Sequence, residues 1–173
     1  MHQQMKKYAV AIGLSAASVV SAGEFDSNIP MLDKGAATYY VASEINGLGA
    51  VDLMVDTGSG YMTINEETLA ILQASDNATY VKKLSGVLAD GSTLTVPVYR
   101  ISQLRIGEAC TLNNVEAAVF PGKTRQILGL SALRQAAPFI FSMNPPKLVL
   151  SNCTARVAQA DEAANTVAVK KIP

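Results

Sequence analysis

The stretch Val51-Asp52-Leu53-Met54-Val55-Asp56-Thr57-Gly58-Ser59-Gly60 is the most informative part of this chain. Its first half is a largely apolar run that predicts a strand, and Asp56 stands where this strand ends in a glycine-rich turn. A carboxylate in such a place is held on a rigid element, close to backbone N–H groups. Two aspartates that face each other can share one proton and activate a water molecule against an amide carbonyl. The chain supplies one such aspartate.

The segment from Val55 to Ser59 resembles the active-site signature of pepsin-type aspartic proteases. Its single copy in a chain of 173 residues is similar to the retropepsin-like branch, whose members work as homodimers. Taken alone, an Asp-Thr-Gly tripeptide is also compatible with an ordinary turn after a strand. The assignment therefore depends on further motifs.

Two further motifs stand in the order that this family requires. Ile127-Leu128-Gly129, followed by residues 130–134, resembles the family's hydrophobic-hydrophobic-glycine element and its short helix. In the family this glycine lets one strand pass beside the catalytic turn, and glycine suits such a close backbone approach. Residues 86–96 resemble the flap hairpin, with Asp90-Gly91 as a favoured turn dipeptide. Together the three motifs span about residues 38–151.

The resemblance implies a catalytic role for Asp56. Its carboxylate would face Asp56 of a second chain, with one oxygen acting as general base toward water and another as acid toward the scissile carbonyl. Thr57 would hydrogen-bond across the dimer, although a simple turn hydroxyl is the alternative for this residue. The residues that the resemblance assigns to the support of the active site are Thr57, Gly58, Ser59 and Gly129. For Ser59, a hydrogen bond to a carboxylate is one expectation.

The sequence offers two further candidate sites, the flap tip and a second carboxylate. By resemblance, Ala89, Asp90 and Gly91 would lie at the flap tip and contact substrate, although a turn-forming role explains Asp90 equally well. Asp52 lies four residues before Asp56 on the same strand, so the two side chains point to the same face about 13 Å apart. That distance is too long for a shared proton, and we expect Asp52 to be a solvated or edge charge.

The remaining pattern predicts an all-β fold. Short strands separated by turn residues indicate a barrel or sandwich, and the resemblance implies the closed barrel of the acid proteases with one or two short helices. One helix is expected from residue 66 to about Ala74, because Asn65 is a good N-cap and two glutamates follow it. The other is expected over residues 131–136. Asn46-Gly47 predicts a hairpin turn.

The N-terminus predicts export from the cytoplasm. Two lysines precede the uncharged, mostly apolar residues 8–20, and Val20-Ser21-Ala22 resembles a cleavage site, which together indicate a signal peptide over residues 1–22. A retained membrane anchor is the alternative. We therefore expect a periplasmic or secreted protein with a linker at 23–36, a protease domain at 37–151 and a poorly ordered tail at 152–173.

Charge and composition exclude several function classes. Removal of residues 1–22 would take away two lysines and His2, the only histidine, and would leave twelve basic against fourteen acidic residues. Such a chain has no basic patch that would favour nucleic acid. Without histidine, Ser–His or Cys–His catalysis and His-ligated zinc are excluded. No phosphate-binding glycine loop is present, so we expect neither cofactor nor metal, and carboxylate chemistry remains.

Cys110 and Cys153 are the two cysteines. In an oxidising compartment an even number of cysteines suggests a disulfide, which would contribute about 3–4 kcal/mol on the chain-entropy estimate. Two free buried thiols are the alternative. The function expected from all these features is an aspartic endopeptidase that acts on peptides or proteins as a homodimer. A peptide-binding or dimerisation module on the same fold, without turnover, is the alternative.

Overall fold

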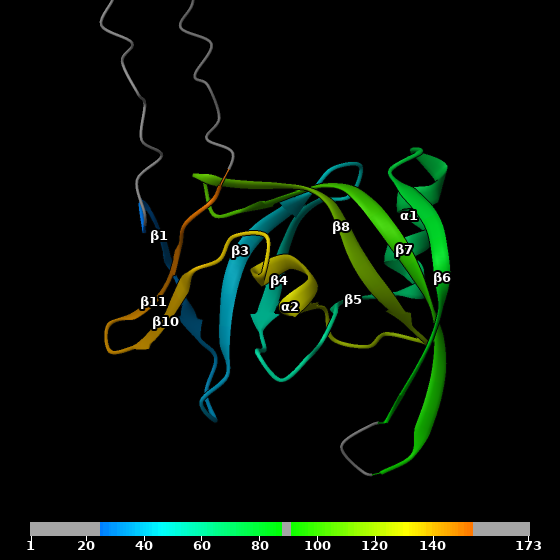
Figure 1. Ribbon diagram of the computed structural model, residues 1–173, viewed down its shortest axis with the longest axis horizontal. Helices are drawn as coiled ribbons and strands as arrows, with labels where there is room; N and C mark the ends of the chain where they lie inside the picture. Colours follow the sequence, from blue (N-terminus) through cyan, green and yellow to red (C-terminus); the bar gives the residue numbers. More distant parts are fainter. Residues whose placement is uncertain (1–24, 88–90, 154–173) are drawn as a thin grey trace, which may run out of the picture.

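The structure is a computed structural model that describes residues 25–87 and 91–153 (Figure 1). The described residues form eleven strands and two short helices, which confirms the prediction of a mostly β fold. The strands are β1 (Ser27–Pro30), β2 (Leu32–Asp33), β3 (Tyr39–Ile45), β4 (Gly49–Val55), β5 (Met62–Asn65), β6 (Ala78–Val87), β7 (Thr93–Ile106), β8 (Cys110–Phe120), β9 (Ile127–Leu128), β10 (Phe139–Met143) and β11 (Pro146–Leu150), and the helices are α1 (Glu66–Ala74) and α2 (Leu130–Leu133).

The main sheet curves back on itself and forms the barrel. Its strand order is β2-β3-β4-β9-β5-β8-β7-β6, and β7 also pairs with β3. The β3–β7 pairing joins residues 43–45 to residues 104–106, so the six strands from β3 to β7 are connected in a ring of hydrogen-bonded neighbours. The turn after β3 contains Asn46 and Gly47, as predicted. Strand β9 lies between β4 and β5, with β4 parallel to it and β5 antiparallel.

The core follows from the alternation of side chains along these strands. In β3, Tyr39, Val41, Ser43 and Ile45 are buried while the residues between them are at least partly exposed. Successive strand residues point to opposite faces, so one face of β3 lies inside the barrel. The inner residues of the other strands and the two leucines Leu72 and Leu133 of the helices complete a single large apolar cluster.

The helices are close to their predicted places. Helix α1 begins after Asn65, whose side-chain oxygen accepts a hydrogen bond from Thr68 N at 2.9 Å, and it ends at Ala74 as expected. Helix α2 is shorter than predicted, because it covers Leu130–Leu133 rather than residues 131–136. Of the helices in the described parts of the chain, none is long and apolar enough to cross a membrane.

The expectation of a linker at residues 23–36 is wrong for residues 27–33. Ser27–Pro30 forms β1, which pairs antiparallel with β11 and buries Ile29 to 2% exposure, and β2 pairs with β3. The sequence of β1 is partly polar and ends in Pro30, so it lacks the apolar pattern typical of a strand. In the structure, alternate residues of β1 are nevertheless buried. The folded unit therefore begins before residue 37. The predicted signal segment at 1–22 lies outside the described residues, as does the tail from residue 154.

A second sheet of strand order β1-β11-β10 lies beside the barrel (Figure 1). The expected disulfide is present here: Cys110 at the start of β8 is bonded to Cys153, which follows β11. Cys110 is fully buried within the main core cluster. The bond therefore ties the barrel to the end of the second sheet, at a distance from the turn that carries Asp56.

Candidate active site

Asp56 stands in the turn that joins β4 to β5. Its backbone N–H donates to the carbonyl of Leu128 in β9 at 3.2 Å, which extends the parallel pairing by one residue. Within the turn, Gly58 N donates to Asp56 Oδ1 at 2.9 Å and Ser59 N donates to the Asp56 carbonyl at 3.3 Å. The half-buried carboxylate is therefore oriented by a backbone donor while it remains accessible from outside.

Gly129 is the position where the turn and the segment after β9 come closest. A Cβ atom on Gly129 would lie 2.1 Å from the carbonyl oxygen of Tyr61 and 2.9 Å from that of Ser59, both backbone atoms. No side chain fits at such distances, so glycine is required for steric reasons. The next residue, Leu130, donates its N–H to Ser59 O at 2.8 Å. The structure thus brings together the two motifs that the sequence separates by some 70 residues.

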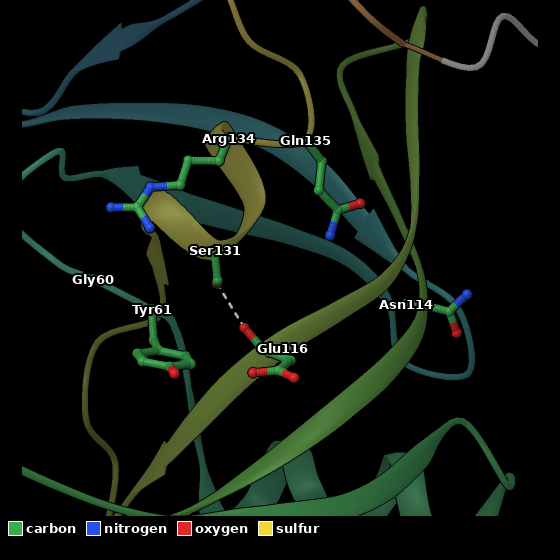
Figure 2. A pocket seen from close by; sticks show the side chains of 7 residues that line it. All are labelled: Gly60, Tyr61, Asn114, Glu116, Ser131, Arg134 and Gln135. Carbon is green, nitrogen blue, oxygen red and sulfur yellow. Dashed lines mark hydrogen bonds between the residues drawn. The ribbon is translucent and has the colours of Figure 1, made fainter.

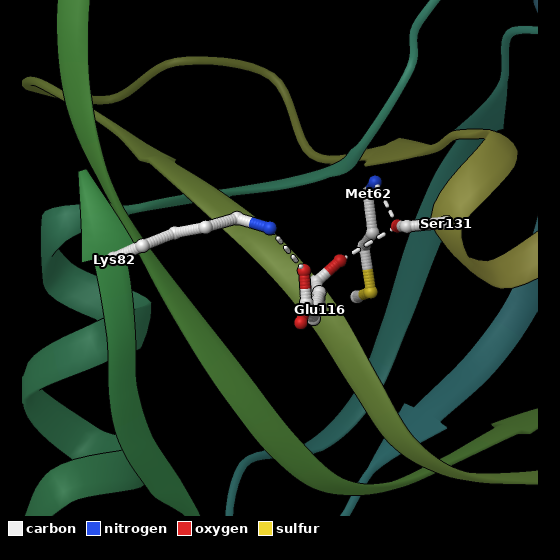
Figure 3. A network of polar contacts seen from close by, with 4 residues as sticks. All are labelled: Met62, Lys82, Glu116 and Ser131. Carbon is white, nitrogen blue, oxygen red and sulfur yellow. Dashed lines mark hydrogen bonds and ion pairs between the residues drawn. The ribbon is translucent and has the colours of Figure 1, made fainter. Parts of the chain in front are cut away.

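Ser131 links three elements behind the turn. Met62 N of β5 donates to Ser131 Oγ at 2.7 Å, and this hydroxyl donates to the Glu116 carbonyl of β8 at 2.6 Å (Figure 3). Sequence reasoning did not assign this residue, because its partners come from two distant strands. Ser59 also differs from expectation: its hydroxyl donates to the Tyr61 carbonyl at 2.7 Å and so braces the turn itself.

A cleft of about 420 Å³ opens over Asp56. The turn and the start of β5 form one side, the outer part of β6 forms another, and the end of β8 with the segment before β9 closes the third. Among the described residues that line it, Asp56 is the only carboxylate. The lining residues are Asp56, Gly58, Ser59, Gly60, Tyr61, Thr63, Leu84, Gly86, Val87, Ala118, Phe120, Thr124 and Ile127.

The β6–β7 hairpin lies where the flap is predicted. It extends beyond the barrel at the lower right of Figure 1, and the side chain of Val87 near its end is 75% exposed. Gly91 has a φ of +83°, a left-handed conformation that suits a turn. Ala89 and Asp90, expected at the tip, lie outside the described residues.

Asp52 and Thr57 are polar residues of the opening stretch that do not line the cleft. Asp52 is exposed and its carboxylate lies 2.7 Å from the Lys34 ammonium, as expected for an edge charge. Thr57 is exposed at the surface of the turn, next to Asp56. Its position leaves the hydroxyl accessible to a second molecule.

A polar cluster that the sequence did not reveal lies next to the cleft (Figure 3). Lys82 Nζ is 3.1 Å from Glu116 Oε2 and 5.4 Å from the centre of the Tyr61 ring. The neighbouring Tyr61 and Glu116 side chains raise the pKa of Lys82 above its ordinary value of 10.5. Tyr61, just before β5, meets Lys82 of β6 and Glu116 of β8 because β7 lies between the last two strands and aligns them, so local sequence gives no signal for the cluster. Within residues 25–87 and 91–153, no group of three or more His, Cys, Asp or Glu side chains could hold a metal ion.

Comparison with models of protein families matches residues 41–135 to the family described as "gag-polyprotein putative aspartyl protease". The matched region is more than half of the chain and contains the Asp56 turn, the β6–β7 hairpin and Gly129. The chain belongs to this aspartic protease family. No curated protein matches the sequence.

A solved structure supports the fold. The crystal structure of a retropepsin-like aspartic protease from Rickettsia conorii matches 75% of this chain and 92% of its own chain, with a TM-score of 0.50 and 18% identity. At this identity the likeness concerns the fold alone. The chain therefore has a retropepsin-like fold, as the three motifs predicted.

Proposed function

We propose that this protein is an aspartic endopeptidase that acts as a homodimer, with Asp56 of each chain forming the catalytic pair. The observation that carries the proposal is the position of Asp56, the only carboxylate among the described residues that line the cleft. Its orientation by Gly58 N and its exposure toward the cleft suit a group that must exchange protons with substrate and water.

The chemistry requires a second carboxylate. One aspartate cannot be both the base that takes a proton from water and the acid that gives one to the substrate at the same moment. Two carboxyls that share one proton perform both tasks, because two like charges at close range keep one group protonated. The second copy of Asp56 would come from a partner chain, and the exposed turn residues Thr57 and Gly58 leave room for that approach.

In the proposed reaction, the ionised Asp56 takes a proton from water as the water oxygen attacks the scissile carbonyl carbon. The protonated partner donates its proton to the carbonyl oxygen, which gives a tetrahedral diol. Asp56 then gives its proton to the amide nitrogen while the partner carboxylate takes a proton from one diol hydroxyl. The C–N bond breaks to give a carboxylic acid and an amine, and the pair returns to its singly protonated form. The flap residues Leu84 and Val87 would hold the peptide over the pair.

The place of action follows from the N-terminal segment. We propose that residues 1–22 direct export and are removed, which leaves the protease in the periplasm or outside the cell. The Cys110–Cys153 disulfide supports this proposal, because disulfides persist in oxidising compartments and are rare in the cytosol.

The decisive experiment uses protein from residue 23 onward with a library of unfolded peptides at several pH values. Wild type should cleave, whereas Asp56→Asn should lose all measurable cleavage and keep the thermal stability of wild type. Asp52→Asn is the matched control and should stay active. Sedimentation should show a dimer under the conditions of cleavage. A strict monomer that binds peptides without cleaving them would instead identify a binding module.

A further inference from the structure

A second pocket adjoins the catalytic cleft (Figure 2). It has a volume of about 470 Å³ and shares Gly60 and Tyr61 with the cleft. The two hollows therefore meet at the segment between the Asp56 turn and β5. A peptide that lies over Asp56 and extends past Tyr61 would reach this second pocket, which is lined on its far side by residues of α2 and β8.

The charges of this pocket are not balanced. Among the described residues that line it, Glu116 is the only acidic one, and its carboxylate is already paired with Lys82 at 3.1 Å. Arg134 also lines the pocket, and within residues 25–87 and 91–153 its guanidinium has neither an ion pair nor a hydrogen bond. A guanidinium offers a fork of N–H donors that matches a carboxylate. The pocket thus presents one positive charge without a partner.

The backbone of Arg134 is fixed in position by helix α2. It directly follows α2, and its backbone N–H donates to Leu130 O at 3.0 Å. Ala132 and Leu133 of the same helix are fully buried, which fixes the start of the side chain. Figure 2 shows Arg134 and Gln135 on one side of the pocket and Tyr61 and Glu116 on the other. In this view the guanidinium extends toward the side of Gly60, where the pocket meets the cleft.

We propose that Arg134 is a specificity-determining residue that binds a carboxylate of the substrate at a distance from the scissile bond. The enzyme then prefers peptides with aspartate or glutamate at that position, or peptides whose C-terminal carboxylate ends there. Gln135 and Asn114 line the same pocket and supply neutral amide donors. This inference rests on the proposed peptidase function, since it assigns part of the substrate to the same cleft.

The test compares wild type with Arg134→Gln, and with Arg105→Gln as a control that removes an arginine charge outside this pocket. Arg105 pairs with Glu44 on the surface of the barrel. A peptide cleaved by wild type is prepared with Glu, Gln or Lys at each position along its length, and with a free or amidated C-terminus. At the sensitive position, wild type should show about a fivefold higher kcat/KM for Glu than for Gln, as expected for a partly exposed charged pair.

Arg134→Gln should bring this ratio to about one while the Gln peptide is cleaved as before, and Arg105→Gln should keep the wild-type ratio. The preference should also weaken at high salt, because screening reduces exposed charge pairs. If the preference follows the free C-terminus instead of the side chain, the carboxylate of the chain end is the ligand. The same ratio in wild type and Arg134→Gln overturns the proposal.

A binding measurement separates this inference from the peptidase function. Fluorescence anisotropy with Asp56→Asn and with the double variant Asp56→Asn, Arg134→Gln reports the Glu-to-Gln preference without any cleavage. A preference that Arg134→Gln abolishes supports the carboxylate site even if wild type cleaves nothing. Equal loss of both peptides, or a dimer that dissociates in Arg134→Gln, would show that the pocket has a structural or subunit-binding role.

Discussion

The turn that carries Asp56 and the outer part of the β6–β7 hairpin line the same cleft, but they are held in place by different means. The turn is fixed by backbone hydrogen bonds to Leu128 and Leu130 and by the close packing of Gly129. The outer hairpin, here residues 84–87 and 93–96, has one buried residue, Val96, which belongs to a small cluster separate from the main core. Segments with few buried contacts open at a lower free energy than segments packed into a core.

This difference suits the proposed chemistry. Proton transfer depends on close placement of the carboxylate, so the catalytic group belongs on a well-constrained part of the backbone. The hairpin that would cover a substrate must instead admit and release peptides of varied shape. The comparison therefore predicts that equal substitutions have unequal effects: near the turn they should change stability, and on the outer hairpin they should change substrate binding.

The largest expected effect comes from Gly129→Ala. Because the new methyl group would meet backbone atoms of Tyr61 at 2.1 and 2.5 Å, β9 or the turn must move. We expect a loss of at least about 3 kcal/mol in the free energy of unfolding, the upper range for overpacking. Gly86→Ala is the matched control on the hairpin, since a Cβ there meets no atom within 4 Å. Similar losses in thermal unfolding of both variants would contradict the comparison.

A smaller effect, on substrate binding rather than on stability, is expected from Val87→Ser. The side chain is 75% exposed and lines the cleft, so its removal should leave the unfolding free energy within about 0.5 kcal/mol of wild type. Peptide affinity or kcat/KM should fall about fivefold, which corresponds to about 1 kcal/mol of lost apolar contact. Leu32→Ser provides a control, because Leu32 is exposed to 53% and lies outside the cleft. An unchanged kcat/KM in Val87→Ser would exclude a substrate contact by this part of the flap.

The same contrast explains what the sequence could predict. The Asp56 turn and Gly129 were identified because both stand in short motifs that resemble those of the aspartic proteases, and the apolar strands on either side gave their positions. Strand β1 was missed because its stability comes from pairing with β11, more than a hundred residues away, and its own composition is polar. The Lys82–Glu116 pair and the Arg134 pocket were missed for a related reason. Their residues come from separate strands and a helix, and the barrel alone sets their distances.

The smallest effect is expected from Lys82→Met. This substitution removes the positive charge of the Lys82–Glu116 pair and keeps an unbranched side chain of similar length. The neighbouring Tyr61 and Glu116 side chains raise the pKa of Lys82, so the folded state favours the charged form. A raised pKa means that this contribution is fully present below the ordinary value of 10.5 and is lost as the pH rises through the folded pKa. The stability difference between wild type and Lys82→Met should therefore be small and constant from pH 6 to 9 and should shrink in more alkaline solution. Denaturant unfolding of both proteins across this range measures the difference, and a gap that widens above pH 10 would show that the ammonium does not stabilise the fold.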